Sequence, residues 1–165
     1  MTPLSLLGAQ TFLTKLTSGD ALEQQIMLIS NNANAQVPPI RSERVVLSSI
    51  PMEVADKNVQ LGYPRVCIYS SSVKNYRTEK FRSFSGEVAV AVEIWASGDL
   101  ITDVDTWIHY YVEAVAEILQ ESAGDWGSGM FYSGDYDVQF QVAKPGGLGF
   151  VEAAKLTFFL NVSVT

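Results

Sequence analysis

The chain of 165 residues contains one cysteine, Cys67, and one histidine, His109. A single cysteine cannot form an internal disulfide and excludes a cysteine-rich zinc site. A single histidine excludes histidine-rich metal centres and any mechanism that needs two imidazoles. Charge is scarce as well, because 18% of the residues are Asp, Glu, Lys or Arg, whereas an average soluble domain has about 25%. We interpret this shortage as a sign that other copies of the chain, or partners, cover part of the surface.

Long apolar runs are also missing, since no segment of the sequence approaches the roughly 18 uninterrupted apolar residues of a membrane span. The amino-terminal segment lacks the basic start of a secretory signal, and we expect it to be a folded element of a cytosolic protein. The chain has 11 Lys and Arg against 18 Asp and Glu, which gives a formal net charge of −7. Nonspecific binding of nucleic acid requires a basic surface, so this composition argues against it.

The sequence does contain the pattern of a single domain, residues 1–165, in three parts. Residues 1–31 are expected to be helical, with an interruption at Gly19 and with Asp20 as the cap of the second half. Residues 32–64 form a connector that contains four prolines and one strand-like piece at 45–47. Residues 65–165 form a core of sheet and helix.

Strands and one long helix alternate in this core. Strands are predicted at 65–69, 87–95, 136–142 and 156–164, with a polar loop at 70–82 and a hairpin tip at 144–149. Apolar residues recur at helical spacing through residues 99–121. In the strand 87–95, the small Ala89 and Ala91 are expected to let a helix lie close to the sheet. The fold class is therefore α+β, a mainly antiparallel sheet packed by one long amphipathic helix (about 99–121), plus an N-terminal helical segment.

His109 lies in a row of polar residues four apart on the predicted long helix. The other members of the row are Asp105, Glu113, Glu117 and Glu121. A His and a Glu one turn apart supply two metal ligands, fewer than the three or four of a real site. We therefore interpret the row as an acidic stripe that is solvated or faces a basic partner.

Other candidate motifs have simpler explanations. Asp125, Asp135 and Asp137 do not match a calcium-binding loop, and residues 146–149 lack the following helix that a phosphate loop needs. Cys67 is expected to be a buried structural thiol. No catalytic, cofactor-binding or metal site is predicted, so we expect no enzyme. The tryptophans Trp95, Trp107 and Trp126 are compatible with a ligand pocket or with packing.

The distribution of charge is the most informative feature. Residues 41–82 contain eight basic and four acidic residues, whereas residues 87–152 contain twelve acidic residues and one lysine. One explanation is neutralisation within the chain. The other is head-to-tail association, in which the basic patch of one copy meets the acidic patch of the next and the contacts close into a ring.

The order of elements from residue 60 to 164 resembles a known family. The segment Tyr63-Pro64-Arg65-Val66-Cys67-Ile68-Tyr69 is followed by a polar loop to Phe84, the strand at 87–95, a break at 97–99 and the helix. This order resembles the tail terminator (tail completion) proteins of long-tailed bacteriophages. The resemblance implies a structural virion protein, assembled in the host cytoplasm, that forms a homo-oligomeric ring, typically a hexamer. Such a ring caps the tail tube and joins it to the head, with tail-tube and neck or head-closure proteins as partners, no cofactor, no membrane, and DNA passing without specific binding.

Three hypotheses follow from these observations. In the first, the basic residues Arg77, Lys80 and Arg82 of one copy contact Asp103, Asp105 or Glu113 of its neighbour in such a ring. The amino-terminal helices and the connector depart from the compact family pattern, so another neck or head-closure role stays open. The second hypothesis is a non-enzymatic domain that binds a small ligand between Trp95, Trp107 and Tyr110. The third is a hydrolase that uses an aspartate and His109.

Overall fold

The computed structural model describes residues 2–48, 62–146 and 149–165. The amino-terminal region forms two helices, α1 (Leu4–Thr17) and α2 (Ala21–Asn32), joined by a single 3-10 turn at Ser18–Asp20. Gly19 has a left-handed φ of 59°, which confirms the predicted interruption. Asp20 occupies the N-cap position of α2, as predicted, but its side chain makes no hydrogen bond to the backbone of the helix. It instead accepts a hydrogen bond of 2.8 Å from the Ser42 hydroxyl.

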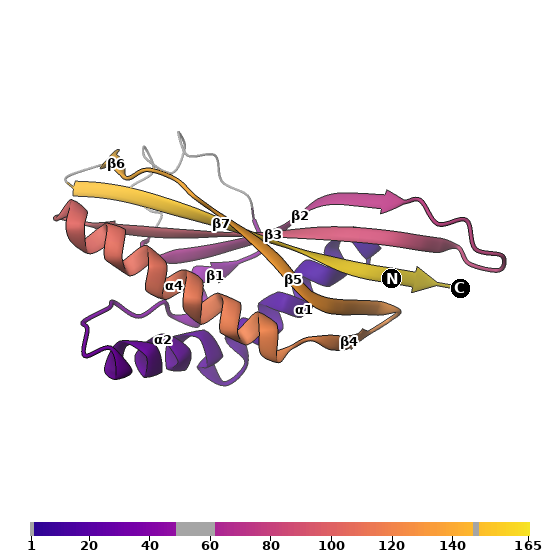
Figure 1. Ribbon diagram of the computed structural model, residues 1–165, viewed down its shortest axis with the longest axis horizontal. Coiled ribbons are helices and arrows are strands. Elements are labelled where there is room, and N and C mark those ends of the chain that lie inside the picture. Colours follow the sequence, from indigo (N-terminus) through magenta and orange to yellow (C-terminus); the bar gives the residue numbers. More distant parts are fainter. Residues whose placement is uncertain (1, 49–61, 147–148) are drawn as a thin grey trace.

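A curled sheet forms the centre of the molecule (Figure 1). Its strands are β1 (Val45–Val46), β2 (Arg65–Asn75), β3 (Phe84–Gly98), β4 (Gly124–Gly127), β5 (Met130–Phe140), β6 (Lys144–Gly146) and β7 (Gly149–Val164). The order across the sheet is β1-β2-β3-β7-β5-β4, with β6 paired to β7. The β1–β2 pair is parallel, and the β2–β3, β3–β7, β5–β7 and β4–β5 pairs are antiparallel. This architecture confirms the predicted α+β class with a mainly antiparallel sheet.

The strands are longer than the sequence predicted. The segment expected to be a loop at 70–82 begins as strand, because Ser70–Asn75 continue β2 and pair with β3 as far as Asn75 opposite Gly86. Likewise, β5 begins at Met130 rather than at residue 136, and the glycine-containing break after the long helix forms β4. Mostly polar side chains hid the extension of β2, whereas Met130 and Tyr132 of β5 are buried and alternate with the exposed Phe131.

The main core lies between one face of this sheet and the helices. Helix α4 (Ile101–Glu121) runs along that face, and α1 packs beside it. Val88, Val90 and Val92 of β3 point to this side and are fully buried. The prediction for Ala89 and Ala91 is wrong, because the period of two places them on the opposite face. The small residue that permits close approach lies on α1: a Cβ atom on Gly8 would stand 2.7 Å from Leu160 Cδ1.

An aromatic cluster fixes α1 to the sheet. The Phe12 ring lies 6.1 Å from Trp126, stacked at 11°, and 5.0 Å from Phe158 in an edge-on arrangement. Trp126 and Phe158 also contact Tyr132, whose hydroxyl is buried. Burial raises the pKa of Tyr132 to about 12. Edge-on and stacked pairs stabilise such clusters beyond the area they bury.

Part of the predicted connector is packed against α4. The Trp107 indole donates a hydrogen bond to the Gln36 carbonyl at 3.1 Å, and the Tyr111 hydroxyl donates to the Pro38 carbonyl at 2.7 Å. Ile40 is fully buried, and the predicted strand-like piece forms β1. Residues 49–61, including Pro51, lie outside the described residues. Within the described part of the chain, no helix is long and apolar enough to span a membrane.

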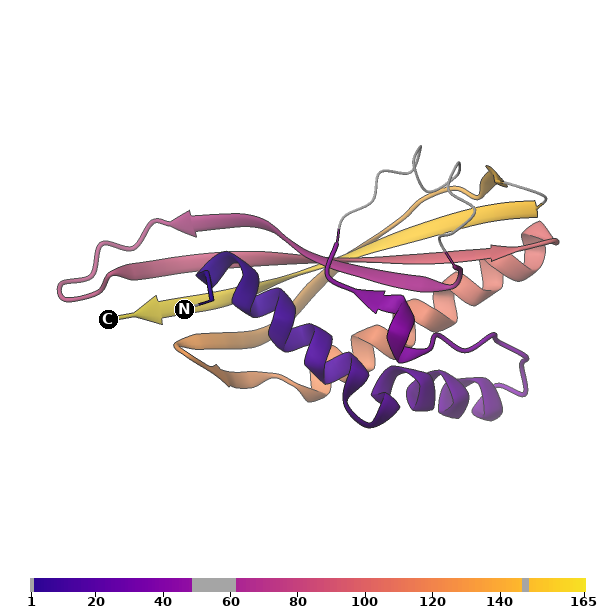
Figure 2. The same cartoon turned by 180° about the vertical axis from the view of Figure 1, so that it is seen from behind.

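The molecule is elongated, and its two ends differ (Figures 1 and 2). One end is formed by the β2–β3 hairpin, with both chain termini nearby. Helix α2 and the start of α4 lie toward the other end. The hairpin tip and the start of α4 therefore belong to different parts of the surface, although Lys74 of β2 lies opposite Glu87 of β3 in the sheet.

A candidate self-association site

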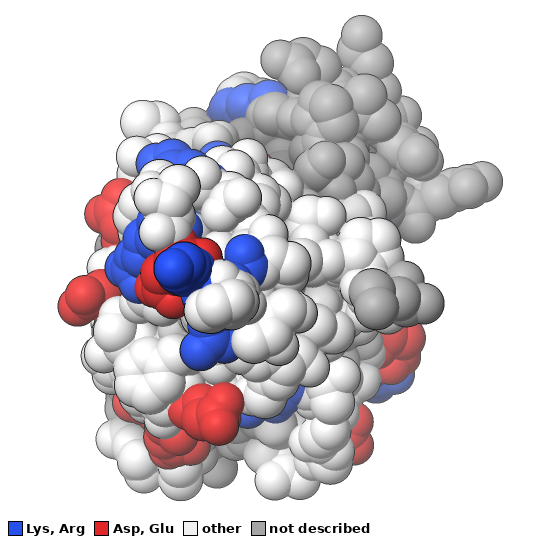
Figure 3. Space-filling model, turned by 90° about the vertical axis from the view of Figure 1, so that its right-hand side faces the viewer, with Lys and Arg blue, Asp and Glu red and all other residues white. Residues whose placement is uncertain are grey.

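The basic residues of the sequence hypothesis lie at the tip of the β2–β3 hairpin. We call residues 76–83 the basic tip. Its backbone is tied to the sheet by hydrogen bonds from the Arg77 amide to the Ser85 carbonyl at 3.0 Å and from the Ser83 amide to the Val164 carbonyl at 2.8 Å. Arg77, Lys80 and Arg82 are exposed. Figure 3 looks toward this end of the molecule, where blue atoms of Lys and Arg surround a red carboxylate.

An exposed aromatic ring stands among these cations. Phe81 is 87% exposed, and its backbone adopts a left-handed φ of 70°, which is rare for a bulky residue. The Lys80 amine lies 5.9 Å from the centre of the Phe81 ring, and the Arg77 guanidinium lies 5.4 Å from the centre of the Tyr76 ring. The tip thus presents apolar area and positive charge together, a combination typical of interface anchors.

The acidic residues of the hypothesis lie on α4. Asp103, Asp105 and Glu113 are exposed, and Asp103 in the first turn complements the helix dipole. Asp105 and Glu113 stand at a notch of about 410 Å³ on the outer side of the helix, together with His109 and Tyr110. The long helix is therefore buried on one side and negatively charged on the other.

The two surfaces do not neutralise each other within one chain. Among the described residues, no ion pair joins the basic segment 41–82 to the acidic segment 87–152, and the recorded pair, Arg82 to Glu79 at 3.7 Å, lies inside the basic tip itself. The tip projects at one end of the molecule, while α4 begins at the other (Figures 1 and 2). Opposite charges that are separated in this way are available to a second molecule.

One acidic residue beneath α4 was missed by the sequence reasoning. Glu152 of β7 faces the helix, is 5% exposed, and has an Oε2 atom that is buried without a hydrogen-bond partner in the described structure. Burial in the first place, and the neighbouring Asp105 in the second, raise the pKa of Glu152 to about 7. The alternation of β7 could have revealed this position, because Glu152 has the parity of Ala154, Leu156 and Phe158, which face the core.

His109 takes part in packing. It is exposed on α4, as predicted, and its ring lies 4.6 Å from the ring of Phe140 at the end of β5. In the described part of the chain, no group of three or more His, Cys, Asp or Glu side chains is arranged to hold a metal ion.

The residues of the small-ligand hypothesis are separated by the sheet. Trp95 packs with Cys67, Val151 and Ala153 in a cluster of its own, whereas Trp107 and Tyr110 pack against the main core. Cys67 is a buried free thiol, as predicted, and burial raises its pKa. A raised pKa suppresses the reactive thiolate, so Cys67 is not an activated nucleophile.

The glycine-rich segment forms a hairpin, as predicted from its composition. Gly146 pairs with Gly149 at the start of the β6–β7 ladder, while Gly147 and Leu148 lie outside the described residues. A strand, rather than a helix, follows this turn, so it lacks the helix N-terminus that binds phosphate.

Comparison with known proteins does not add a relationship: no family model and no curated protein matches this chain. The arrangement of its charged surfaces is therefore the main guide to what the protein does.

Proposed function

We propose that this chain is a structural subunit that assembles head to tail into a ring, and that the ring is a tail terminator at the head–tail junction of a bacteriophage. The observation that carries the proposal is the separation of the basic tip from the acidic side of α4, without ion pairs between them in the described structure. The resemblance of residues 60–164 to tail terminator proteins supplies the identity of the ring.

A contact between two different surfaces has a geometric consequence. Such a heterologous contact leaves one unused surface at each end of every oligomer, so it continues until the ends meet. Closure gives a ring in which every copy is equivalent. In this ring, Arg77, Lys80 and Arg82 of each copy face Asp103, Asp105 and Glu113 of the next.

Charge complementarity in this contact determines orientation more than strength. An exposed ion pair contributes about 0.2–1 kcal/mol, so three such pairs alone would hold two copies weakly. They do steer the encounter and suppress tip-to-tip contacts, which would bring like charges together.

The net charge of −7 supports the passage of DNA without binding. Phosphates are repelled by a negative surface, and nonspecific DNA binding gains its strength from the counterions that basic side chains displace from the DNA phosphates. A ring of such subunits would therefore let DNA pass freely.

The proposal is tested by measuring mass and partner binding together. Purified protein is examined by light scattering and negative-stain electron microscopy, alone and with assembled phage tail tubes. We expect rings whose mass is a multiple of 18.1 kDa, located at tube ends. A protein that stays monomeric in both samples and does not bind tubes would contradict the proposal. Rings that bind isolated head or neck complexes but not tubes would instead indicate a head-closure role.

A further inference from the structure

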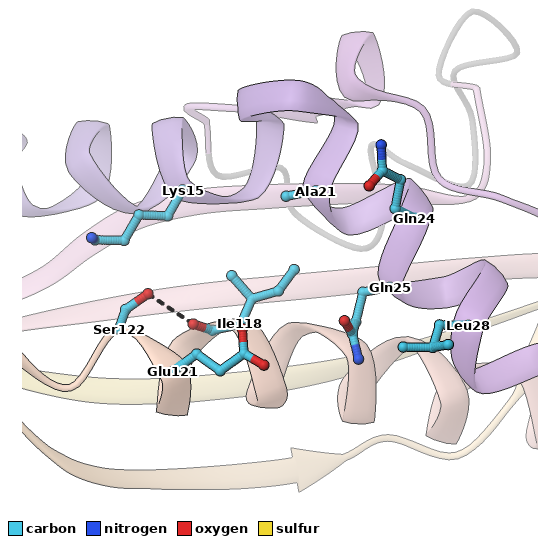
Figure 4. A pocket seen from close by; sticks show the side chains of 8 residues that line it. All are labelled: Lys15, Ala21, Gln24, Gln25, Leu28, Ile118, Glu121 and Ser122. Atoms are coloured by element: carbon cyan, nitrogen blue, oxygen red, sulfur yellow. Dashed lines mark hydrogen bonds between the residues drawn. The ribbon is translucent and has the colours of Figure 1, made fainter. Parts of the chain in front are cut away.

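A groove runs along the contact between α2 and the second half of α4. It consists of two adjoining hollows of about 630 Å³ and 310 Å³, which share Gln25 and Leu28 as lining residues. Figure 4 shows the larger hollow, with Gln25 and Leu28 of α2 on one side and Ile118 and Glu121 of α4 on the other. The Gln25 amide donates a hydrogen bond to the Glu117 carboxylate at the boundary between the two hollows.

Lys15 and Glu121 both line the larger hollow, whereas the smaller hollow has Glu113 and Glu117 and no Lys or Arg among its lining residues. The smaller hollow therefore combines apolar area with negative charge. Leu28 is 54% exposed at its rim, and Ile29 and Tyr110 line the smaller hollow. The carboxylates of Glu113, Glu117 and Glu121 follow one another at four-residue spacing along α4. Like charges at this spacing repel each other, so the row is stabilised when a cation binds between its members.

The basic tip has the complementary chemistry. Its Phe81 ring is the most exposed aromatic side chain among the large exposed apolar residues of the described structure, and Lys80 and Arg82 flank it in the sequence. Within one chain, the tip and α2 lie toward opposite ends of the molecule (Figures 1 and 2), so the tip of a second copy, and not that of the same chain, can meet the groove. A large exposed apolar side chain next to a matching hollow marks an interaction site.

We propose that Phe81 of one copy inserts into the α2–α4 groove of a second copy, against Leu28, while Lys80 and Arg82 pair with Glu113 and Glu117. This inference rests on the proposed head-to-tail association, and it adds an aromatic anchor and a specific acceptor. Glu113 belongs both to the notch on the outer side of α4 and to this groove. The contact therefore reaches over the helix toward α2, which the sequence did not implicate.

Disulfide trapping tests the location of the contact. Phe81→Cys and Leu28→Cys are prepared as separate variants, mixed, and oxidised with copper phenanthroline. The native Cys67 is fully buried and remains in all samples as a common background. We expect the mixture to form a covalent dimer at least about tenfold faster than a mixture of Phe81→Cys with Val142→Cys, whose position is 88% exposed. Equal rates in the two mixtures would overturn the proposal.

A second variant tests the Phe81 side chain without changing the backbone conformation of the tip. Asparagine tolerates a left-handed φ better than phenylalanine, so Phe81→Asn removes the ring without straining the tip. We expect this variant to weaken self-association at least about tenfold, as loss of an aromatic anchor does, whereas Val142→Asn leaves it unchanged. Self-association that survives Phe81→Asn would overturn the proposal that Phe81 is an anchor, and it would leave the proposed head-to-tail oligomer intact. Absence of any self-association in the unmodified protein would instead contradict both.

Discussion

The buried Glu152 of β7 lies beneath α4, and burial together with the neighbouring Asp105 of that helix raises the pKa of its carboxyl group. Burial and a nearby negative charge both favour the protonated form of a carboxyl group, so a proton is bound where the helix packs on the sheet. The pair lies directly below the acidic side of α4, and its protonation therefore affects both stability and surface charge.

Replacement of Glu152 by glutamine is expected to change how stability depends on pH. Burial and Asp105 raise the pKa of Glu152 from its ordinary value of 4.5 to about 7, so the folded chain binds a proton that the unfolded chain has released. The resulting stabilisation is complete below pH 4.5 and is lost as the pH rises through 7. Glu152→Gln stays neutral, so above pH 7 it should be more stable than the unmodified protein, by up to about 3 kcal/mol.

Thermal unfolding at pH 5, 6, 7 and 8 measures this effect. The exposed Glu121→Gln serves as the control that removes a carboxylate from the same helix. We expect the stability curve to flatten between pH 5 and 8 only in the Glu152 variant. Parallel curves for Glu152→Gln and the unmodified protein would show that the buried carboxyl does not titrate in this range.

Two glycines of the β4–β5 hairpin region form a matched test of close backbone approach. Gly127 and Gly129 have similar φ angles of 81° and 79°, but a Cβ atom on Gly129 would lie 2.2 Å from the Ser163 carbonyl oxygen, whereas none lies within 4 Å at Gly127. Each alanine substitution meets the left-handed strain of about 1–2 kcal/mol. Gly129→Ala should lower the free energy of unfolding well beyond that, as measured by urea denaturation. Equal losses at the two positions would mean that the hairpin moves away from β7 without cost.

The aromatic cluster at α1 is expected to dominate the stability of the amino-terminal half. Phe12 is fully buried between Trp126 and Phe158, so Phe12→Ala should lower the free energy of unfolding by about 3–5 kcal/mol. Leu6→Ala, at a site on the same helix that is 39% exposed, should cost much less. Tryptophan fluorescence during urea denaturation measures the free energy of unfolding of both variants. Similar losses would indicate that α1 is not held to the sheet through this cluster.

The fold class was predictable because the core follows simple periodicities. Val88, Val90 and Val92 alternate in β3, and the apolar positions of α4 recur at helical spacing, so both elements were expected close to where they occur. The extension of β2 to Asn75 was not predictable in this way, since Ser70–Asn75 are polar except for the exposed Val73 and lie beyond the main core. The pairing with β3, rather than any local pattern, determines that this segment is a strand.

The charged residues of the candidate site were predictable in type, but their surroundings were not. The sequence indicated a basic segment and an acidic helix. It could not indicate that Phe81 projects from the tip, because exposure depends on how far the β2–β3 hairpin extends past its neighbours. Nor could it indicate that Ala89 and Ala91 face away from the helices, since an alternating strand does not specify which of its two faces is covered.

The central claim is tested most directly by exchanging the two charged surfaces. One variant reverses the tip (Arg77→Glu, Lys80→Glu, Arg82→Glu), and the other reverses α4 (Asp103→Lys, Asp105→Lys, Glu113→Lys). In each variant alone, tip and helix carry the same sign and repel, so light scattering should report monomers of 18.1 kDa. In an equimolar mixture, every tip meets a helix of opposite sign, and we expect assembly to return with the two variants alternating. A tip-reversed variant that assembles to the same mass as the unmodified protein would contradict the account.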